Sequence, residues 1–250
     1  MILRSPLLSS IPGLVHGFTT RIGGRSRGHF ASLNVGTGLG DDDTLVAENR
    51  RLVAVEAGLP SVYMVSQVHG SRLIVVGRSC TPEETATEEA DALASTEPGR
   101  AVAVRTADCL PILLADPEAG VVAAIHAGWR GTVAGVAAGS VDLLRRRLGL
   151  DPARAVAALG PCIRPCCFEV GEEVARKVGE SWPRAVCRRG DLLTVDLACA
   201  NGEALVSAGL APERVDDLGL CTACDSRRFF SHRRDRGTTG RQMSYVALAR

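Results

Sequence analysis

The feature that most constrains the fold is a pair of apolar runs, residues 112–115 and 121–125, separated by Asp-Pro-Glu-Ala-Gly. The proline presets φ and the glycine lets the chain reverse, so the pattern predicts a β-hairpin. Residues that pair across a hairpin have a constant sum of residue numbers. Cys109 and His126 are therefore expected to be direct or diagonal neighbours, with Cβ atoms roughly 5–8 Å apart.

A thiol and an imidazole at this separation can share a metal ion or act as a nucleophile and its base. A purely structural pair, with Cys109 as a small apolar residue and His126 hydrogen-bonded in the core, fits the same spacing. The segment Ala-Gly-Trp-Arg-Gly that follows His126 favours a functional role. Its glycines permit close approach of a ligand, and Arg130 can bind an anion.

The composition is that of a globular chain: 250 residues, 46% of them apolar, with a net charge of +1. No repeat or Gly/Ser/Pro-rich linker divides the sequence, so we expect one domain over residues 1–250. The nearly neutral charge gives no field that would attract nucleic acid or an anionic membrane. No run approaches the ~20 apolar residues of a membrane helix. We therefore expect small-molecule partners, and the sequence leaves monomer and homodimer open.

The nine cysteines are an odd number, and Arg4 and Pro6 stand where an export signal would need an apolar core. Free thiols in a reducing cytoplasm fit these features best. Lys177 is the only lysine, so contacts with anions must be made by arginine guanidinium groups.

Strand-like and helix-like segments follow one another irregularly. The patterns predict helices at residues 44–57, 132–147, 170–181 and 197–208. They predict strands at 16–21, 62–68, 73–76, 89–92, 101–105, 155–159, 192–195, 215–218 and 242–248, with an exposed loop at 79–89. Because the order is not a regular βαβα series, a Rossmann fold or barrel is disfavoured. The expected class is α+β with mixed sheets in a single domain.

His69 ends a predicted strand and precedes a glycine, which makes it a third candidate ligand. With Cys109 and His126 it would form a set of two imidazoles and one thiolate, donors that suit Zn²⁺. Three protein ligands leave a fourth position for water, whose pKa falls to ~7 on zinc. The set therefore predicts an open, catalytic zinc site.

Two carboxylates lie near these ligands. Asp108 precedes Cys109, and on an extended strand its side chain would point away from the metal, which predicts a supporting role. Asp91 is a candidate general acid or base.

Other polar segments have two interpretations each. The cysteines of two segments (Cys162, Cys166 and Cys167; Cys221 and Cys224) could form a structural zinc site, but their spacing favours free thiols. The tail 225–241 contains six arginines and two aspartates, and is either a solvated surface or an anion site. The Gly- and Arg-rich stretch 23–29 is either a flexible connection or an anion-binding loop.

Nine short motifs are distributed along nearly the whole chain. They occupy residues 16–24, 32–36, 67–70, 89–92, 107–109, 126–131, 160–163, 230–234 and 239–241. Together they resemble the YfiH-type laccase-domain family, whose members are also described as multifunctional purine nucleoside phosphorylases.

The resemblance implies a zinc site on His69, Cys109 and His126, and one domain in α/β/β/α layers with a fold like that of a deamidating toxin. It implies phosphorolysis of adenosine, inosine and methylthioadenosine, and deamination of adenosine. The residues expected to bind substrate or phosphate are Arg21, Asn34, Arg130, Arg233 and Arg241.

Three other functions remain open at this point. A copper polyphenol oxidase is the older family label, but five histidines are too few for a multicopper site. A metal-free thiol hydrolase would use Cys109 and His126 alone. A non-catalytic factor in cell-wall editing is a further role attached to the family. Zinc deaminases add a glutamate for proton transfer, and no glutamate is clearly placed for this here.

Overall fold

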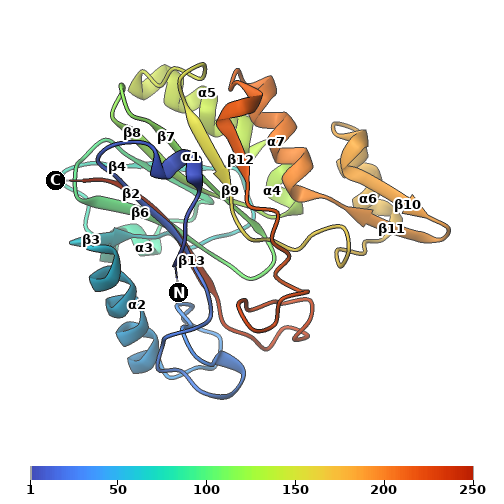
Figure 1. Cartoon of the computed structure of the whole chain (residues 1–250), viewed down its shortest axis with the longest axis horizontal. Coiled ribbons are helices and arrows are strands. Elements are labelled where there is room, and N and C mark those ends of the chain that lie inside the picture. Colours follow the sequence, from blue (N-terminus) through green and yellow to red (C-terminus); the bar gives the residue numbers. More distant parts are fainter. Residues whose placement is uncertain (1, 250) are drawn as a thin grey trace.

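The computed structural model describes residues 2–249, so Met1 and Arg250, at the ends of the expected domain, lie outside its description. Two mixed β-sheets pack face to face, and helices cover their outer faces (Figure 1). The expected α+β class in α/β/β/α layers is confirmed. No helix among the described residues is long and apolar enough to cross a membrane.

The first sheet is antiparallel except for the pairing of its edge strand β3 with β6. Its order is β1 (Ile2–Leu3), β2 (Leu14–Thr19), β13 (Gln242–Leu248), β6 (Arg100–Thr106) and β3 (Ser61–Tyr63). Helix α2 (Asp43–Ala57) covers its outer face, where Val53 packs against Ala103 and Tyr245 in one buried cluster. Asp42 caps α2, so the helix begins at Asp43, one residue before its predicted start. Gly58 ends it.

The second sheet is centred on the predicted hairpin. Its order is β12 (Val215–Asp217), β9 (Val156–Leu159), β7 (Leu110–Asp116), β8 (Val121–Ala127), β5 (Ala92–Ser95) and β4 (Leu73–Val76). Its outer face is covered by α4 (Trp129–Val133), α5 (Val136–Leu148) and α7 (Leu197–Ser207). On β8, Ala123 and Ile125 face these helices, whereas Val122 and Ala124 face the first sheet. Both faces are buried, which explains the uninterrupted apolar runs.

The register of β7 and β8 decides between the two predicted arrangements of the cysteine and histidine. Pro111 pairs with His126, so Cys109, which directly precedes β7, lies diagonal to His126 rather than opposite it.

The helix predicted at residues 132–147 is instead two helices, α4 and α5. Gly135 separates them with φ +74°, in the left-handed region that a continuous helix cannot contain. The buried face belongs to α5, where Ala137, Val141 and Leu144 pack on the sheet, whereas Val133 in α4 is exposed.

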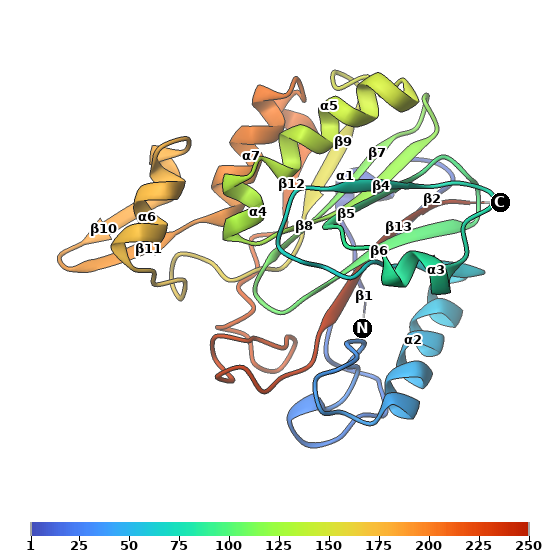
Figure 2. The same ribbon diagram turned by 180° about the vertical axis from the view of Figure 1, so that it is seen from behind.

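Other differences are local. The expected loop 79–89 contains α3 (Pro82–Thr87), which a capping box of Thr81 and Glu84 stabilises. The strand predicted at 62–68 is limited to β3. Elements not predicted are β1, α1 (Pro6–Ser9), β10 (Val186–Arg189) and the 3-10 turns Gly28–Phe30, Pro183–Ala185 and Pro212–Arg214. Strand β10 pairs with β11 (Leu192–Val195), and this hairpin projects from the sandwich together with α6 (Glu172–Gly179) (Figure 2).

Candidate functional site

Three candidate ligands meet at one end of the sandwich. Cys109 precedes β7, His126 is the penultimate residue of β8, and His69 lies in the connection between β3 and β4. One potential ligand atom from each side chain lies within 4.8 Å of the other two. The rings of His69 and His126 are arranged edge to face, with centroids 4.9 Å apart. The structure therefore brings together the three residues that the sequence singled out.

Asp91, just before β5, holds both histidines through one buried carboxylate. Its Oδ1 accepts hydrogen bonds from His126 Nδ1 at 2.8 Å and from the backbone N–H of His69 at 2.9 Å. Its Oδ2 accepts a hydrogen bond from the backbone N–H of Gly70 at 2.6 Å. These bonds fix His69 at φ +62°, a backbone conformation that is uncommon for a residue other than glycine.

The same contacts assign a different role to Asp91 from the acid or base predicted. Burial raises the pKa of its carboxyl group. The hydrogen bonds from His126 and the two backbone amides lower this pKa by a larger amount, so the net shift is downward. Asp91 is thus an ionised positioning residue with its oxygens occupied. Because Nδ1 of His126 donates to it, Nε2 is the nitrogen that could bind a metal once it has lost its proton.

Cys109 and His126 form a charged pair. Burial raises the pKa of the Cys109 thiol, but the charge and hydrogen bonds of the two histidines outweigh this and lower it to about 6. Burial lowers the pKa of His126, but the Cys109 thiolate and the Asp91 carboxylate raise it to about 9. At neutral pH the sulfur is therefore a thiolate, the form that binds metal or attacks an electrophile.

Gly128 keeps the space in front of the ligands open. A Cβ atom at this position would lie 3.0 Å from both Cys109 Sγ and His69 Cδ2, too close for an unshifted structure. This explains one glycine of the segment after His126 by geometry. Two imidazoles and a thiolate around a cleared space fit a zinc ion well.

The ligands open into a cavity of about 460 Å³, within the size range of small-molecule sites. Four guanidinium groups line it, those of Arg105, Arg130, Arg233 and Arg241. Within residues 2–249 none of the four forms an ion pair with a carboxylate. Burial, and then the charges of Arg50 and Arg241, lower the pKa of Arg105 to about 10. Positive charge gathered without carboxylate partners favours an anionic ligand.

Two of the five residues expected to bind substrate lie elsewhere. Arg21 donates from Nε to the backbone oxygen of Ala31 at 2.7 Å and stacks on Phe230. Asn34 is fully buried, and its Oδ1 accepts a hydrogen bond from the backbone N–H of Arg241 at 2.9 Å. Neither lines the cavity, nor does any described residue of the stretch 23–29. Arg130, Arg233 and Arg241 do line it.

Asp108 links the tail of the chain to the site. Its backbone has φ +96° rather than an extended conformation, so the prediction from strand alternation was wrong. Its carboxylate accepts hydrogen bonds from Thr222 Oγ1 and from the backbone N–H of Arg233, both at 2.6 Å.

Sequence reasoning missed Arg105 and Gln67. Arg105 is the one charged residue within the apolar run 101–106, and that signal could have identified it. The Gln67 side chain pairs with the backbone of Arg105, donating to its oxygen at 2.9 Å and accepting from its nitrogen at 2.8 Å.

Known proteins resemble this chain over nearly its full length. It is 38% identical to the purine nucleoside phosphorylase YlmD of Geobacillus stearothermophilus over 94% of this chain and 90% of that protein. It is 40% identical to a purine nucleoside phosphorylase of Deinococcus radiodurans, over 100% of this chain and 93% of the relative. Adenosine deaminase RL5, from an unknown prokaryotic organism, is 34% identical over 95% of each chain.

The crystal structure of YlmD from Geobacillus stearothermophilus matches with a TM-score of 0.93 at 36% identity, over 100% of this chain and 96% of that chain. Residues 15–249 match the model of the family described as multi-copper polyphenol oxidoreductase laccase. The chain belongs to this family, which is the one that its sequence motifs resemble.

Proposed function

We propose that this chain is a zinc-dependent purine nucleoside phosphorylase that acts on adenosine, inosine and methylthioadenosine and also deaminates adenosine. The carrying observation is that three metal-ligand side chains share one cavity with four guanidinium groups that lack carboxylate partners. Relatives named purine nucleoside phosphorylase and adenosine deaminase support the same two reactions. We further propose a cytoplasmic enzyme, because its nine cysteines are free.

We assign the zinc to His69, Cys109 and His126. Zinc bound there supplies a Lewis acid and lowers the pKa of a water ligand. Copper is the alternative suggested by the family description, and a multicopper centre needs more imidazoles than this site offers. The other described cluster that could hold a metal contains cysteines alone. His16, by contrast, is buried away from the cavity and accepts a hydrogen bond from the backbone N–H of Ser5.

In phosphorolysis a phosphate oxygen forms a bond to C1′ of the ribose while the C1′–N9 bond breaks. The purine leaves with the electron pair and takes up a proton. Arg105, Arg130, Arg233 and Arg241 can hold the phosphate, since paired N–H donors match its oxygens and balance its charge. Asp108 and Asn34 position two of these arginines through the backbone amides of Arg233 and Arg241.

In deamination water adds to C6 of adenosine and ammonia leaves, which requires proton transfer. No glutamate is among the described lining residues. Outside the three assigned zinc ligands, His232 and Asp108 are the described lining residues with acid–base side chains, and we assign the proton transfer to these two. Trp129 and Phe168 offer aromatic surface to a purine, although each already has a guanidinium over its ring.

The first test combines metal analysis with product identification. Purified protein is expected to contain zinc and to convert inosine and phosphate to hypoxanthine and ribose 1-phosphate, measured by chromatography. His126→Ala should lower kcat/KM about 100-fold or more, because a ligand is lost. His29→Ala removes an exposed histidine and should leave activity unchanged. Full activity after complete removal of zinc would sink the proposal.

A metal-free thiol hydrolase is favoured by one observation, the lowered pKa of Cys109. Alkylation distinguishes the two functions. If Cys109 is a zinc ligand, saturating zinc should slow its modification by iodoacetamide and preserve activity. Equally fast modification and inactivation with and without zinc would favour the thiol enzyme.

A further inference from the structure

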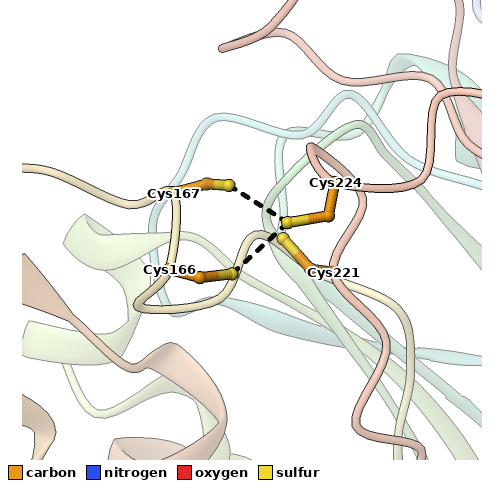
Figure 3. Close-up of side chains that lie close together, drawn as sticks. All are labelled: Cys166, Cys167, Cys221 and Cys224. Carbon is orange, nitrogen blue, oxygen red and sulfur yellow. Dashed lines mark hydrogen bonds between the residues drawn. The ribbon is translucent and has the colours of Figure 1, made fainter.

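Four cysteines from two distant segments converge outside the cavity (Figure 3). Cys166 and Cys167 lie in the connection between β9 and α6, and Cys221 and Cys224 follow β12. Their four sulfur atoms all lie within 4.8 Å of one another. Cys162, which the sequence grouped with them, is instead fully buried in the apolar core behind the second sheet.

The distances between the sulfurs suit a single tetrahedral ion. Zn–S bonds of about 2.3 Å place the sulfurs of a tetrahedral site about 3.8 Å apart. Here the Sγ of Cys224 lies 3.5 Å from that of Cys166 and 3.3 Å from that of Cys167. A disulfide would join only two of the four sulfurs and would leave the gathering of the other two unexplained.

The surrounding backbone also favours bound thiolates. The N–H of Arg164 donates to the Sγ of Cys221 at 3.5 Å, and the N–H of Cys224 donates to the same sulfur. Hydrogen bonds of this kind stabilise negative charge on a ligand sulfur. The cysteines are exposed or half-buried, so metal can reach them.

We propose that Cys166, Cys167, Cys221 and Cys224 form a closed, four-thiolate zinc site with a structural role. Both segments lack regular secondary structure here, and a short parallel bridge joins them. In that bridge the N–H of Thr222 donates to the oxygen of Cys162 at 3.0 Å. A zinc ion with all four positions filled by protein would fasten the two segments where the sheets do not.

This zinc would stiffen one wall of the cavity. Phe168, next to Cys167, lines the cavity. Arg233, which also lines it, donates from Nη1 to the backbone oxygen of Glu169 at 2.8 Å. The proposed zinc ion would thus hold the segment that contains Phe168 against the segment that contains Arg233. The site does not depend on the function proposed for the cavity.

Metal analysis of variants separates the two sites. Under reducing conditions with added zinc, the full chain is expected to bind two zinc ions. A variant with His69→Ala and His126→Ala should keep one zinc, and X-ray absorption should find four sulfurs at about 2.3 Å around it. When Cys221→Ser and Cys224→Ser are added to this variant, the remaining zinc ion should be lost and the melting temperature should fall. Adding Cys187→Ser instead, on β10 and outside the cluster, should retain it.

The absorption spectrum decides the question even if the serine variant does not fold, because it is measured on the four-cysteine protein. Nitrogen or oxygen ligands, iron in place of zinc, or a Cys167–Cys224 disulfide without bound metal would overturn the proposal. So would a zinc ion that persists in a folded Cys221→Ser, Cys224→Ser protein. If the cavity site does not bind zinc but the four-cysteine site does, the wild type and the His69→Ala, His126→Ala variant would each contain one zinc ion.

Discussion

At the scale of single residues, the candidate site depends on Asp91, a side chain that does not line the cavity. Asp91 holds the ring of His126 and the backbone of His69 with the same carboxylate. It therefore couples the orientation of two ligands that are 57 positions apart in the numbering. A change at this residue should disturb both histidines while leaving all three ligands present.

Asp91→Asn tests that coupling. The amide offers one acceptor oxygen where two are used, so zinc affinity should fall 10- to 100-fold, roughly the effect of losing such an outer partner. Competition with a chelator measures the affinity. Asp116→Asn is the matched control, because Asp116 is also fully buried but lies at the far end of β7. Unchanged zinc affinity in Asp91→Asn would show that the histidines are held by other contacts.

The four cavity arginines, which lack carboxylate partners, should contribute to the binding of phosphate and not to the attack of water. Arg241→Met removes a charge from the cavity and keeps most of the side-chain volume. The KM for phosphate in inosine phosphorolysis should rise about 10-fold or more, the effect of losing a charge-assisted hydrogen bond. Deamination of adenosine without phosphate should be little changed. Arg145→Met, on the exposed face of α5, is the control. A parallel loss of both reactions would contradict this division.

The sequence predicted that the three candidate ligands would meet, but it predicted only part of their surroundings. Cys109 and His126 follow from hairpin pairing, which depends on local order alone. Arg105 was missed because its partner Gln67 comes from another segment, so only the fold shows that both face the site. Arg21 and Asn34 lie in other motifs, and the fold directs their side chains to backbone groups outside the cavity lining, Ala31 and Arg241 respectively.

At the scale of elements, two apolar runs on either side of a turn with proline and glycine made the hairpin predictable. The break between α4 and α5 was not predictable. Apolar spacing along residues 132–147 predicted one continuous face, but only its part in α5 is buried and Val133 in α4 is exposed. The left-handed conformation of Gly135 ends α4 and begins α5, and glycine alone does not reveal its own φ.

The same substitution, glycine to alanine, should have opposite effects on the free energy of unfolding at Gly135 and at Gly139. Gly135→Ala should lower the free energy of unfolding by roughly 1–2 kcal/mol, because alanine is strained at φ +74° although no atom would crowd its Cβ. Gly139→Ala, inside α5 with open space around it, should raise stability by up to about 1 kcal/mol. Urea unfolding measures both. A stabilised Gly135→Ala protein would mean that α4 and α5 can join.

At the scale of the whole molecule, the strands place the candidate site at one end of the sandwich, and irregular segments complete its lining. The tail 221–241 reaches the site through side-chain bonds such as that between Asp108 and Thr222. Such bonds leave no periodic signal in a sequence, so the layers could be predicted and the path of the tail could not. Its convergence with Cys166 and Cys167 has the same explanation.

The two sheets are also tied together through a buried histidine. His16 on β2 accepts a hydrogen bond from the backbone N–H of Ser5 at 3.0 Å, and Ser5 donates from Oγ to Asp216 on β12. Burial, followed by the charge of Arg4, lowers the pKa of His16 from 6.5 to about 4. The folded protein therefore keeps this imidazole neutral over a range of pH in which the unfolded chain protonates it.

Stability should consequently fall as the pH decreases from about 6.5 to about 4, because there the unfolded state binds the additional proton. The contribution of His16 is complete above pH 6.5, and its loss amounts to about 3 kcal/mol by pH 4. Urea unfolding of the wild type and of His16→Gln across this range isolates it, since acid release of zinc affects both proteins alike. Glutamine can accept the hydrogen bond from Ser5 but does not titrate, so the stability difference between the proteins should shrink by that amount. A difference independent of pH would mean that His16 is already solvated or protonated in the folded state.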